Sequence, residues 1–310
     1  MSWRKLGQIF RCDDYHLNYA QSPQALILDD RIRIYFSTRK TDESGKFLSR
    51  IDYVDFDQEM ENILGVSDHE VIPLGGLGTF DEHGIFPFSV FQEEGKIAAY
   101  TCGWSRRKSV SVETATGYAV SEDNGETFKK LGNGPVLGPS LHEPFLIGDS
   151  FVRKYEGLYH MWYMYGVRWV KENETSAPDR VYKLAYATSV DGITWESVSR
   201  DIVESVLHEN ECQALPTVIK IGDDYHMYFC YRDVFGFRSD PSKAYRLGHA
   251  VSKDLKHWTR QEDAISFSAE GWDSLMMCYP NIFEVNGKIY LLYNGNEFGR
   301  HGFGAAVWDA

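Results

Sequence analysis

The sequence is poor in the features that mark disulfide-rich domains, zinc sites and membrane spans. It holds only five cysteines, which are scattered along the chain and form no Cys-x-x-Cys pair, so neither a disulfide framework nor a structural zinc site is expected. No apolar run approaches the roughly eighteen residues of a transmembrane helix, and the N-terminal segment MSWRKLGQIF has no apolar stretch of signal-peptide length. We therefore expect a cytoplasmic protein with reduced thiols, no metal and no cofactor.

Positive charge is also scarce. The chain has 32 Lys and Arg against 45 Asp and Glu, which gives a formal net charge of -13. Nucleic acid requires a basic face, and an anionic membrane surface attracts clusters of Lys and Arg. We expect neither of these as a partner.

What the sequence does contain is a unit that recurs about every 64 residues along nearly the whole chain. Each unit begins with an apolar run, a Gly or Asp turn and a second run that ends in aromatic residues. The five units align on Pro23, Pro87, Ser150, Pro216 and Pro280. A strand-rich repeat of this length indicates radial or linear repetition, and because five units fill the chain we expect residues 1–310 to form a single domain.

Each unit is expected to contain four antiparallel strands. A third short strand and a polar turn follow the first two strands and lead to an aromatic residue such as Phe128, Trp195 or Trp258, after which a fourth strand begins. The fifth unit stops at GFGAAVWDA, before its fourth strand. The segment from Trp3 to Leu6 resembles the missing strand, so the prediction is an all-β, five-bladed β-propeller whose last blade is closed by the N-terminal strand.

Two sets of side chains should meet at one mouth of the central channel. The first strand of a blade starts at the mouth to which the antiparallel second strand returns, so residues before the one and after the other converge. The candidates before the first strands are Asp81, His83, Glu143, Asp149, Glu211 and Asp273. The candidates after the second strands are Trp104, Asp233 and four arginines, Arg39, Arg106, Arg168 and Arg232. Structural turns need only Gly, Asn, Asp and Ser, so this mixture indicates a functional pocket.

These features resemble the superfamily of arabinanases, xylosidases, levansucrases, invertases and mannoside phosphorylases. The resemblance rests on five blades, on carboxylates at the start of several first strands and on aromatic-ended turns. The segment from Ile147 to Phe151 is similar to the one whose Asp positions the acid in the arabinanase-like branch, which implies this role for Asp149. Glu211, followed by Cys212, stands in the region of the family's general acid, which implies that role for Glu211.

The chain departs from the family in the first blade. The family has Asp-Pro there, carrying the base or nucleophile, whereas this chain has Ser22 before Pro23. We expect the base to be Asp81, with His83 beside it to orient a water. The alternatives that remain open are Glu143, Asp273 and the more distant Asp14.

The resemblance implies a glycoside hydrolase-like enzyme that cleaves a glycosidic bond of an oligosaccharide or glycoconjugate with inversion. Such cleavage needs one protonated carboxyl to assist the leaving oxygen and one ionised carboxylate to activate water or attack the sugar. A third carboxylate nearby raises the pKa of the acid by like-charge repulsion. The prediction is Glu211 as acid, Asp149 as its modulator and Asp81 as base. The substrate-binding candidates are His83, Glu143, Arg39, Arg168, Arg232, Asp233, Trp104 and Asp273.

Several alternatives remain open from the residues alone. The arginines that follow second strands could bind a carboxylate or phosphate, which would make the carbohydrate partner anionic, or they could neutralise neighbouring carboxylates. A glycoside phosphorylase fits the same pattern. The segment from Ser121 to Phe128 matches the Asp box S-x-D-x-G-x-T-[WF], which also occurs in sialidases, so a sialidase-like enzyme is an alternative. The competing class is a non-catalytic carbohydrate-binding propeller, which is favoured because Ser22 stands where the resembled family has its Asp.

Overall fold

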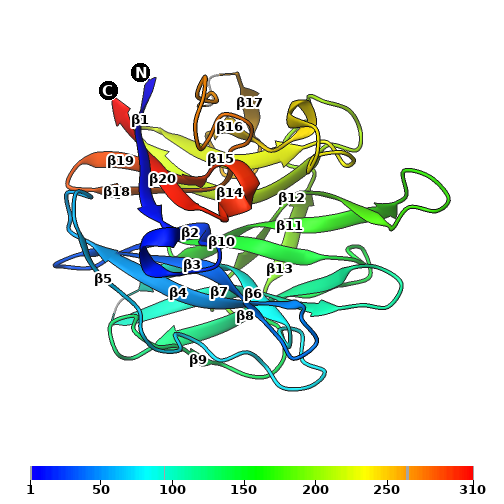
Figure 1. The fold of residues 1–310 in the computed structure, drawn as a ribbon, viewed down its shortest axis with the longest axis horizontal. Helices are drawn as coiled ribbons and strands as arrows, with labels where there is room; N and C mark the ends of the chain where they lie inside the picture. The colour runs from blue at the N-terminus through cyan, green and yellow to red at the C-terminus, as the bar shows by residue number, and fades with distance from the viewer. Residues whose placement is uncertain (1, 94, 263–264, 310) are drawn as a thin grey trace.

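The five repeats fold into five antiparallel blades whose first strands lie side by side around the centre of a ring, and a single parallel bridge between Ser49 and Gly84 joins the first two blades into one sheet (Figure 1). The computed structural model describes residues 2–93, 95–262 and 265–309. Within these ranges, β-strands dominate and the helical elements are three short 3-10 turns, η1 (Cys12–Tyr15), η2 (Pro241–Lys243) and η3 (Asn296–Gly299). The predicted fold class is confirmed.

Each blade has four strands. Blade 1 comprises β2 (Gln21–Ile27), β3 (Ile32–Thr41), β4 (Phe47–Phe56) and β5 (Ile63–Val66). Blade 2 comprises β6 (Gly84–Glu93), β7 (Lys96–Arg106), β8 (Val112–Ser121) and β9 (Lys129–Lys130). Blade 3 comprises β10 (Ile147–Tyr155), β11 (Leu158–Val170), β12 (Asp179–Ser189) and β13 (Glu196–Arg200). Blade 4 comprises β14 (Cys212–Ile221), β15 (Asp224–Arg232), β16 (Arg246–Ser252) and β17 (Thr259–Gln261).

Blade 5 is closed by the N-terminal strand, as predicted. It comprises β18 (Cys278–Val285), β19 (Lys288–Asn294), β20 (Gly302–Asp309) and β1 (Ser2–Arg11). β1 pairs with β20 along its whole length, and the indole of Trp3 donates a hydrogen bond of 3.2 Å to the hydroxyl of Tyr228 in blade 4. The first strand of the chain therefore covers the edge that β20 would otherwise expose.

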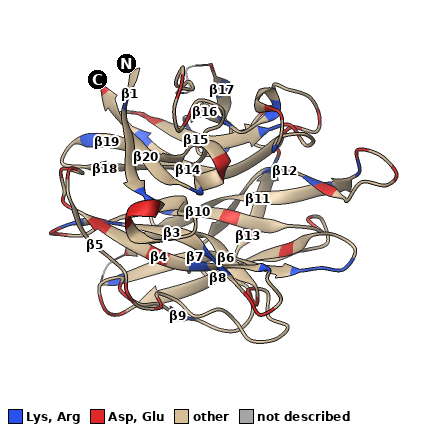
Figure 2. Cartoon of the chain, viewed as in Figure 1, with Lys and Arg blue, Asp and Glu red and all other residues tan. Residues whose placement is uncertain are grey.

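The hydrophobic core consists of clusters between neighbouring blades. For example, Trp162 of β11 is fully buried against Met227 and Phe229 of β15, so an aromatic second-strand residue joins blade 3 to blade 4. Lys, Arg, Asp and Glu are interspersed over the whole ring (Figure 2). No helix in the described ranges is long and apolar enough to cross a membrane.

The Asp boxes have a structural role. The box from Ser121 to Phe128 and a shorter one from Ser189 to Trp195 form turns between third and fourth strands. In the β8–β9 turn the Asp123 carboxylate accepts hydrogen bonds from the hydroxyl of Ser121 and from the backbone and hydroxyl of Thr127. Burial alone would raise the pKa of Asp123, but these hydrogen bonds outweigh it and lower the pKa to about 2. The carboxylate that fixes this turn is thus ionised at neutral pH.

Candidate active site

A bulge at the same point of every first strand delivers side chains to the channel. The pairing register of each first strand with its second strand shifts there. Four of the bulges hold a non-glycine residue at positive φ, and the fifth contains the cis peptide between Phe86 and Pro87. The positive-φ residues are Ser22, Asp149, Leu215 and Tyr279. Such backbone is costly for these residue types and is concentrated at functional sites, so the bulges mark the place to look for one.

A cavity of about 510 Å³ opens where these bulges meet, and we call it the central pocket. Four of the five bulge residues line it, namely Phe86, Asp149, Leu215 and Tyr279. Other walls come from the ends of second strands and the starts of third strands, and many of them are aromatic. The aromatic lining residues are Tyr19, Phe47, Phe86, Trp104, Tyr182, Phe237, Tyr245, Tyr279 and Phe298. Pockets with this composition suit the apolar faces of sugar rings.

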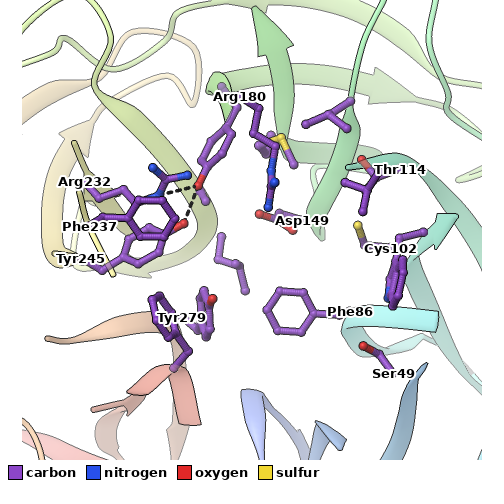
Figure 3. Close-up of a pocket in the computed structure, with 18 of the residues that line it drawn as sticks. Ser49, Phe86, Cys102, Thr114, Asp149, Arg180, Arg232, Phe237, Tyr245 and Tyr279 are labelled. Carbon is purple, nitrogen blue, oxygen red and sulfur yellow. Dashed lines mark hydrogen bonds between the residues drawn. The ribbon is translucent and has the colours of Figure 1, made fainter. Parts of the chain in front are cut away.

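Asp149 is the one carboxylate among the described residues that line the central pocket. It is 7% exposed. Burial raises the pKa of Asp149 to about 7, against the opposing effects of the backbone N–H of Leu215 and the positive charge of Arg180. Figure 3 shows the Arg180 side chain extending from β12 toward this carboxyl. Asp149 can therefore hold a proton near neutral pH inside a partly desolvated pocket.

Four arginines share the pocket lining with this single carboxylate: Arg39, Arg180, Arg232 and Arg238. Arg232 is 1% exposed, and its guanidinium lies 3.5 Å from the centroid of the Phe237 ring. Its Nε donates to the hydroxyl of Tyr182 at 3.0 Å, and its Nη1 donates to the backbone carbonyl of Asp233 at 2.7 Å. These contacts fix the direction of the cation but do not neutralise its charge.

The structure places Glu211 outside the central pocket, so the expectation that it faces substrate is wrong. The side chain is fully buried, and its carboxylate accepts the N–H groups of Val206 and Leu207, the amide of Gln213 at 2.9 Å and Nη1 of Arg260 at 2.7 Å. Burial alone would raise the pKa of Glu211, but the Gln213 and Arg260 contacts outweigh it and lower the pKa. A carboxylate held in this way is ionised at neutral pH and has no proton to donate.

Asp81 and Asp273 lie in the same type of arrangement as Glu211. Each is about 1% exposed and binds a cation from the fourth strand of its own blade: Lys130 for Asp81, and Lys5, at 2.7 Å, for Asp273. Glu211 and Arg260 of β17 repeat this contact in blade 4. The repeated contact ties the loop that enters a blade to the outermost strand of that blade, and it keeps these carboxylates away from the central pocket. The expected position of Asp81 as a base facing substrate is therefore wrong.

Glu143 is the equivalent residue of blade 3. It accepts a hydrogen bond of 2.8 Å from Tyr163 and one of 3.2 Å from Ser197 of the fourth strand β13, and it is 2% exposed. Its expected contact with substrate is therefore also corrected. Asp14 lies exposed on η1, and Ser22 is buried, with its backbone N–H donated to Asn294 at 2.7 Å.

The remaining candidates divide between the pocket and its surroundings. Trp104, Arg39 and Arg232 line the central pocket, as expected. His83 stacks on Trp104, with ring centroids 5.9 Å apart, from outside the lining.

Three polar candidates are engaged elsewhere on the surface. Arg106 forms an ion pair of 2.7 Å with Asp42. Arg168 donates to Asn210 and to Glu209, and Asp233 contacts His208 at 3.0 Å. The structure thus brings together one of the predicted carboxylates and two of the predicted arginines.

Sequence reasoning missed Arg180, Arg238 and Leu215. Arg180 lies at the start of the third strand β12, opposite Trp169 near the end of the second strand β11. The start of a third strand therefore lies at the same mouth as the end of the second strand. A rule that also counted the starts of third strands would have found Arg180. Leu215 occupies the repeat position of Asp149, which the alignment of the units contained. Arg238 lies in the loop after β15 and carries no such signal.

The described residues contain no group of three or more His, Cys, Asp or Glu arranged to hold a metal ion. All five cysteines are buried and free. Cys102 lines the central pocket beside Asp149, and burial raises the pKa of its thiol well above the usual value. The chemistry available in the pocket is therefore that of one neutral or ionised carboxyl, several guanidinium groups and aromatic rings.

Comparison with known proteins gives relatives of unknown activity and structures of known class. No family model matches the chain. "Uncharacterized protein MT1551" and "Uncharacterized protein Rv1502", both from Mycobacterium tuberculosis, are each 31% identical over 317 residues, which cover 100% of this chain and of each relative.

Among solved structures, the complex of BT0996 with RGII matches with a TM-score of 0.73 and 18% identity, over 99% of this protein and 91% of that one. A thermostable family-43 glycoside hydrolase matches with a TM-score of 0.66 and 12% identity, over 93% and 88%. The Bombyx mori GH32 β-fructofuranosidase BmSUC1 matches with a TM-score of 0.62 and 14% identity, over 94% and 62%. At these identities the fold is shared, which confirms the predicted resemblance at the level of architecture.

Proposed function

We propose that this chain, which belongs to the same family as the Mycobacterium tuberculosis proteins MT1551 and Rv1502, is an enzyme that cleaves a glycosidic bond in its central pocket. The fold that it shares with a family-43 glycoside hydrolase and a GH32 β-fructofuranosidase supports a carbohydrate substrate. Function resides in a site and not in a fold, so the proposal depends on the residues of the pocket.

The observation that carries the proposal is Asp149. It stands on a positive-φ bulge, its carboxyl is buried in the central pocket, and its pKa of about 7 lets it keep a proton at neutral pH. When the glycosidic bond breaks, the aglycone oxygen leaves poorly as an alkoxide, so an acid of this pKa that protonates that oxygen contributes to bond cleavage. We assign to Asp149 the role of proton donor to the leaving oxygen.

This assignment replaces the roles that the resemblance implied. Glu211 is ionised and held by Arg260, so it cannot be the donor, and Asp149 then has no acid to modulate. Inversion requires a second carboxylate across the pocket to activate water. The lining residues that the structure describes provide none, so we do not include inversion in the proposal.

The second candidate function is carbohydrate binding without turnover. The observation that favours it is the same missing carboxylate, together with Ser22 at the bulge where the resembled family has Asp. A binding module has no need of a carboxyl that holds a proton at neutral pH, and this is why we place the enzyme first.

The test is a screen of nitrophenyl glycosides and oligosaccharides with the wild-type protein, Asp149→Asn and a matched control, Asp233→Asn. Asp233 is a carboxylate of the same mouth that contacts His208 and lies outside the central pocket. We expect Asp149→Asn to lower turnover by about 100-fold or more and Asp233→Asn to change it by less than about threefold. Glycan binding without turnover in the wild-type protein would establish the binding module instead.

A further inference from the structure

The charge of the central pocket is opposite to that of the protein. The whole chain carries a formal charge of -13, yet four arginines and one carboxylate line the described part of this pocket. With Asp149 protonated, the lining carries four positive charges and no negative one. Neutral sugars need no such excess, because hydroxyl groups are bound by donors and acceptors of any charge.

Three of the four arginines have no counter-ion among the described residues. In the described ranges, the polar side-chain partner of Arg39 is Gln21, at 2.8 Å, and that of Arg180 is Ser111, at 3.2 Å. Neither these two residues nor Arg232 forms an ion pair with a described carboxylate. Arg238 approaches Asp179 only to 3.9 Å. A guanidinium that is buried without a counter-ion, as Arg232 is, is unfavourable unless an anion joins it.

Their geometry directs three of these cations to one region. The ring of Phe237 carries two of them, with the guanidinium of Arg232 at 3.5 Å and that of Arg238 at 4.1 Å from its centroid. Loss of solvent lowers the pKa of Arg238, and the positive charges of Arg180 and Arg232 lower it further, so the three cations repel one another. Repulsion of this kind is relieved when an anion binds between the cations.

Donors remain available for such an anion. A guanidinium has five N–H groups. Nη1 of Arg180 donates to Ser111, and Nε and Nη1 of Arg232 donate to Tyr182, Asp233 and Val234. The other guanidinium nitrogens of Arg180, and those of Arg238, make no hydrogen bond to a described residue. Guanidinium groups that come from β12, from β15 and from the loop after β15 can each take a different oxygen, which suits a tetrahedral group better than a planar carboxylate.

We infer that the central pocket binds a phosphate or sulfate group between Arg180, Arg232 and Arg238, next to Asp149. The inference rests on the proposed function for its biological meaning: the substrate is a saccharide that carries such a group, or free phosphate enters beside a neutral saccharide. In either case the anion and the acid would be neighbours, because the charge of Arg180 acts on Asp149 and also on Arg238.

This neighbourhood couples anion binding to the protonation of Asp149. The groups that face its carboxyl are Arg180 on β12, the thiols of Cys102 on β7 and Cys230 on β15, and the backbone N–H of Leu215. Burial raises the pKa of both thiols, so they stay neutral. Asp149 is then the group that titrates near neutral pH, and its ionised form repels the anion. Affinity should fall as pH rises through about 7.

The test measures sulfate binding by calorimetry. Sulfate is the probe because it keeps its charge over the pH range used. We expect Arg180→Gln and Arg238→Gln each to weaken binding by about tenfold or more, and the control Arg168→Gln, whose arginine contacts Asn210 and Glu209, to leave it within about twofold. No binding by the wild-type protein, or equal loss in the Arg168 control, overturns the inference.

The pH dependence provides a second readout that a purely structural role would not move. Wild-type affinity for sulfate should fall by about tenfold or more between about pH 5.5 and pH 8.5, and Asp149→Asn should remove most of this fall. A fall of the same size in Asp149→Asn contradicts the coupling and places the anion elsewhere.

A third arm identifies the source of the anion. Faster turnover of phosphorylated than of neutral glycosides assigns the group to the substrate, and stimulation of neutral glycoside cleavage by inorganic phosphate assigns it to a co-substrate. The two proposals fail differently. Sulfate binding without any glycoside cleavage would support the anion site and contradict the proposed enzyme. Cleavage of neutral glycosides without sulfate binding would support the proposed enzyme and contradict the anion site.

Discussion

Replacing Glu211 by glutamine separates a structural carboxylate from a catalytic one. Glu211 has no exposed surface and forms an ion pair with Arg260, whose side chain is only 9% exposed. Glutamine keeps the size of the side chain but removes the charge. The guanidinium of Arg260 then stays buried without a counter-ion, while its contact with Tyr231, at 4.1 Å from the ring centroid, remains.

The size of the effect follows from this geometry. Breaking a buried ion pair by removing one partner costs about 3–5 kcal/mol. An unfolding entropy of about 2.1 cal/mol/K per residue amounts to roughly 0.65 kcal/mol/K for a chain of this length, so the Tm of Glu211→Gln should fall by about 5–8 °C. The substitution should leave the central pocket intact.

The assay combines thermal melting at neutral pH with activity measured well below the lower Tm. Glu209→Gln is the matched control, because Glu209 is a neighbouring glutamate with a side chain that is 83% exposed, and its Tm should stay within about 1 °C of the wild-type value. We expect Glu211→Gln to keep activity within about threefold. An unchanged Tm combined with a loss of activity of about 100-fold would refute the structural role and restore Glu211 as the acid.

Three further predictions concern closure, titration and the Asp box. Deleting residues 2–11 exposes the edge of β20 and removes Trp3 and the buried Phe10, so it should lower the free energy of unfolding by more than about 5 kcal/mol in urea titrations. A deletion that unfolds at the wild-type urea concentration would show that β1 does not stabilise the ring. The pKa of Asp149 is raised to about 7, against about 3.9 in the unfolded chain. Protonation of Asp149 therefore stabilises the fold fully below about pH 3.9, and this stabilisation is lost as pH rises through about 7. Asparagine does not titrate, so the Tm of Asp149→Asn should rise relative to that of the wild-type protein between about pH 5 and pH 8. A constant Tm difference over that range would contradict the raised pKa. Asp123→Ala should cost about 1–2 kcal/mol with no change in turnover, because Asp123 holds a turn at the rim, and a loss of activity at unchanged stability would argue otherwise.

The fold could be predicted because the same strand pattern recurs in five units of the sequence. Repeats aligned on Pro23 and its four equivalents gave the blade count, and the resemblance of the segment after Trp3 to other fourth strands gave the closure. Strand patterns and turn residues depend on local interactions, so they survive in the sequence of every unit. The assignment of residues 1–310 to one domain stays a prediction.

The site was predicted only in part because side-chain direction is not local. Asp81, Glu143, Glu211 and Asp273 all precede a first strand and point to the fourth strand of their own blade, whereas Asp149 lies within β10, on the bulge. Of these five carboxylates, the one on a bulge, Asp149, is the one that lines the central pocket. The alignment of the repeats distinguishes the bulge position from the positions before it. It does not reveal the positive-φ backbone that turns the side chain at the bulge toward the central pocket.

The anion site shows the same limit from the other side. Arg39 and Arg232, near the ends of second strands, line the central pocket as predicted, whereas Arg106 and Arg168, also near the ends of second strands, are engaged outside it. Whether an arginine is neutralised depends on carboxylates from distant segments, such as Asp42 for Arg106, which only the folded chain brings within reach.

The measurement that tests the central claim most directly is the leaving-group dependence of kcat/KM in Asp149→Asn. If Asp149 donates the proton, kcat/KM of the variant should fall by about 100-fold or more for glycosides with poor leaving groups. For dinitrophenyl glycosides it should fall by less than about tenfold, because dinitrophenolate leaves without being protonated. The wild-type enzyme should show little dependence on the leaving group. An equal loss for good and poor leaving groups, or no loss at all, would contradict the assignment of Asp149 as the acid.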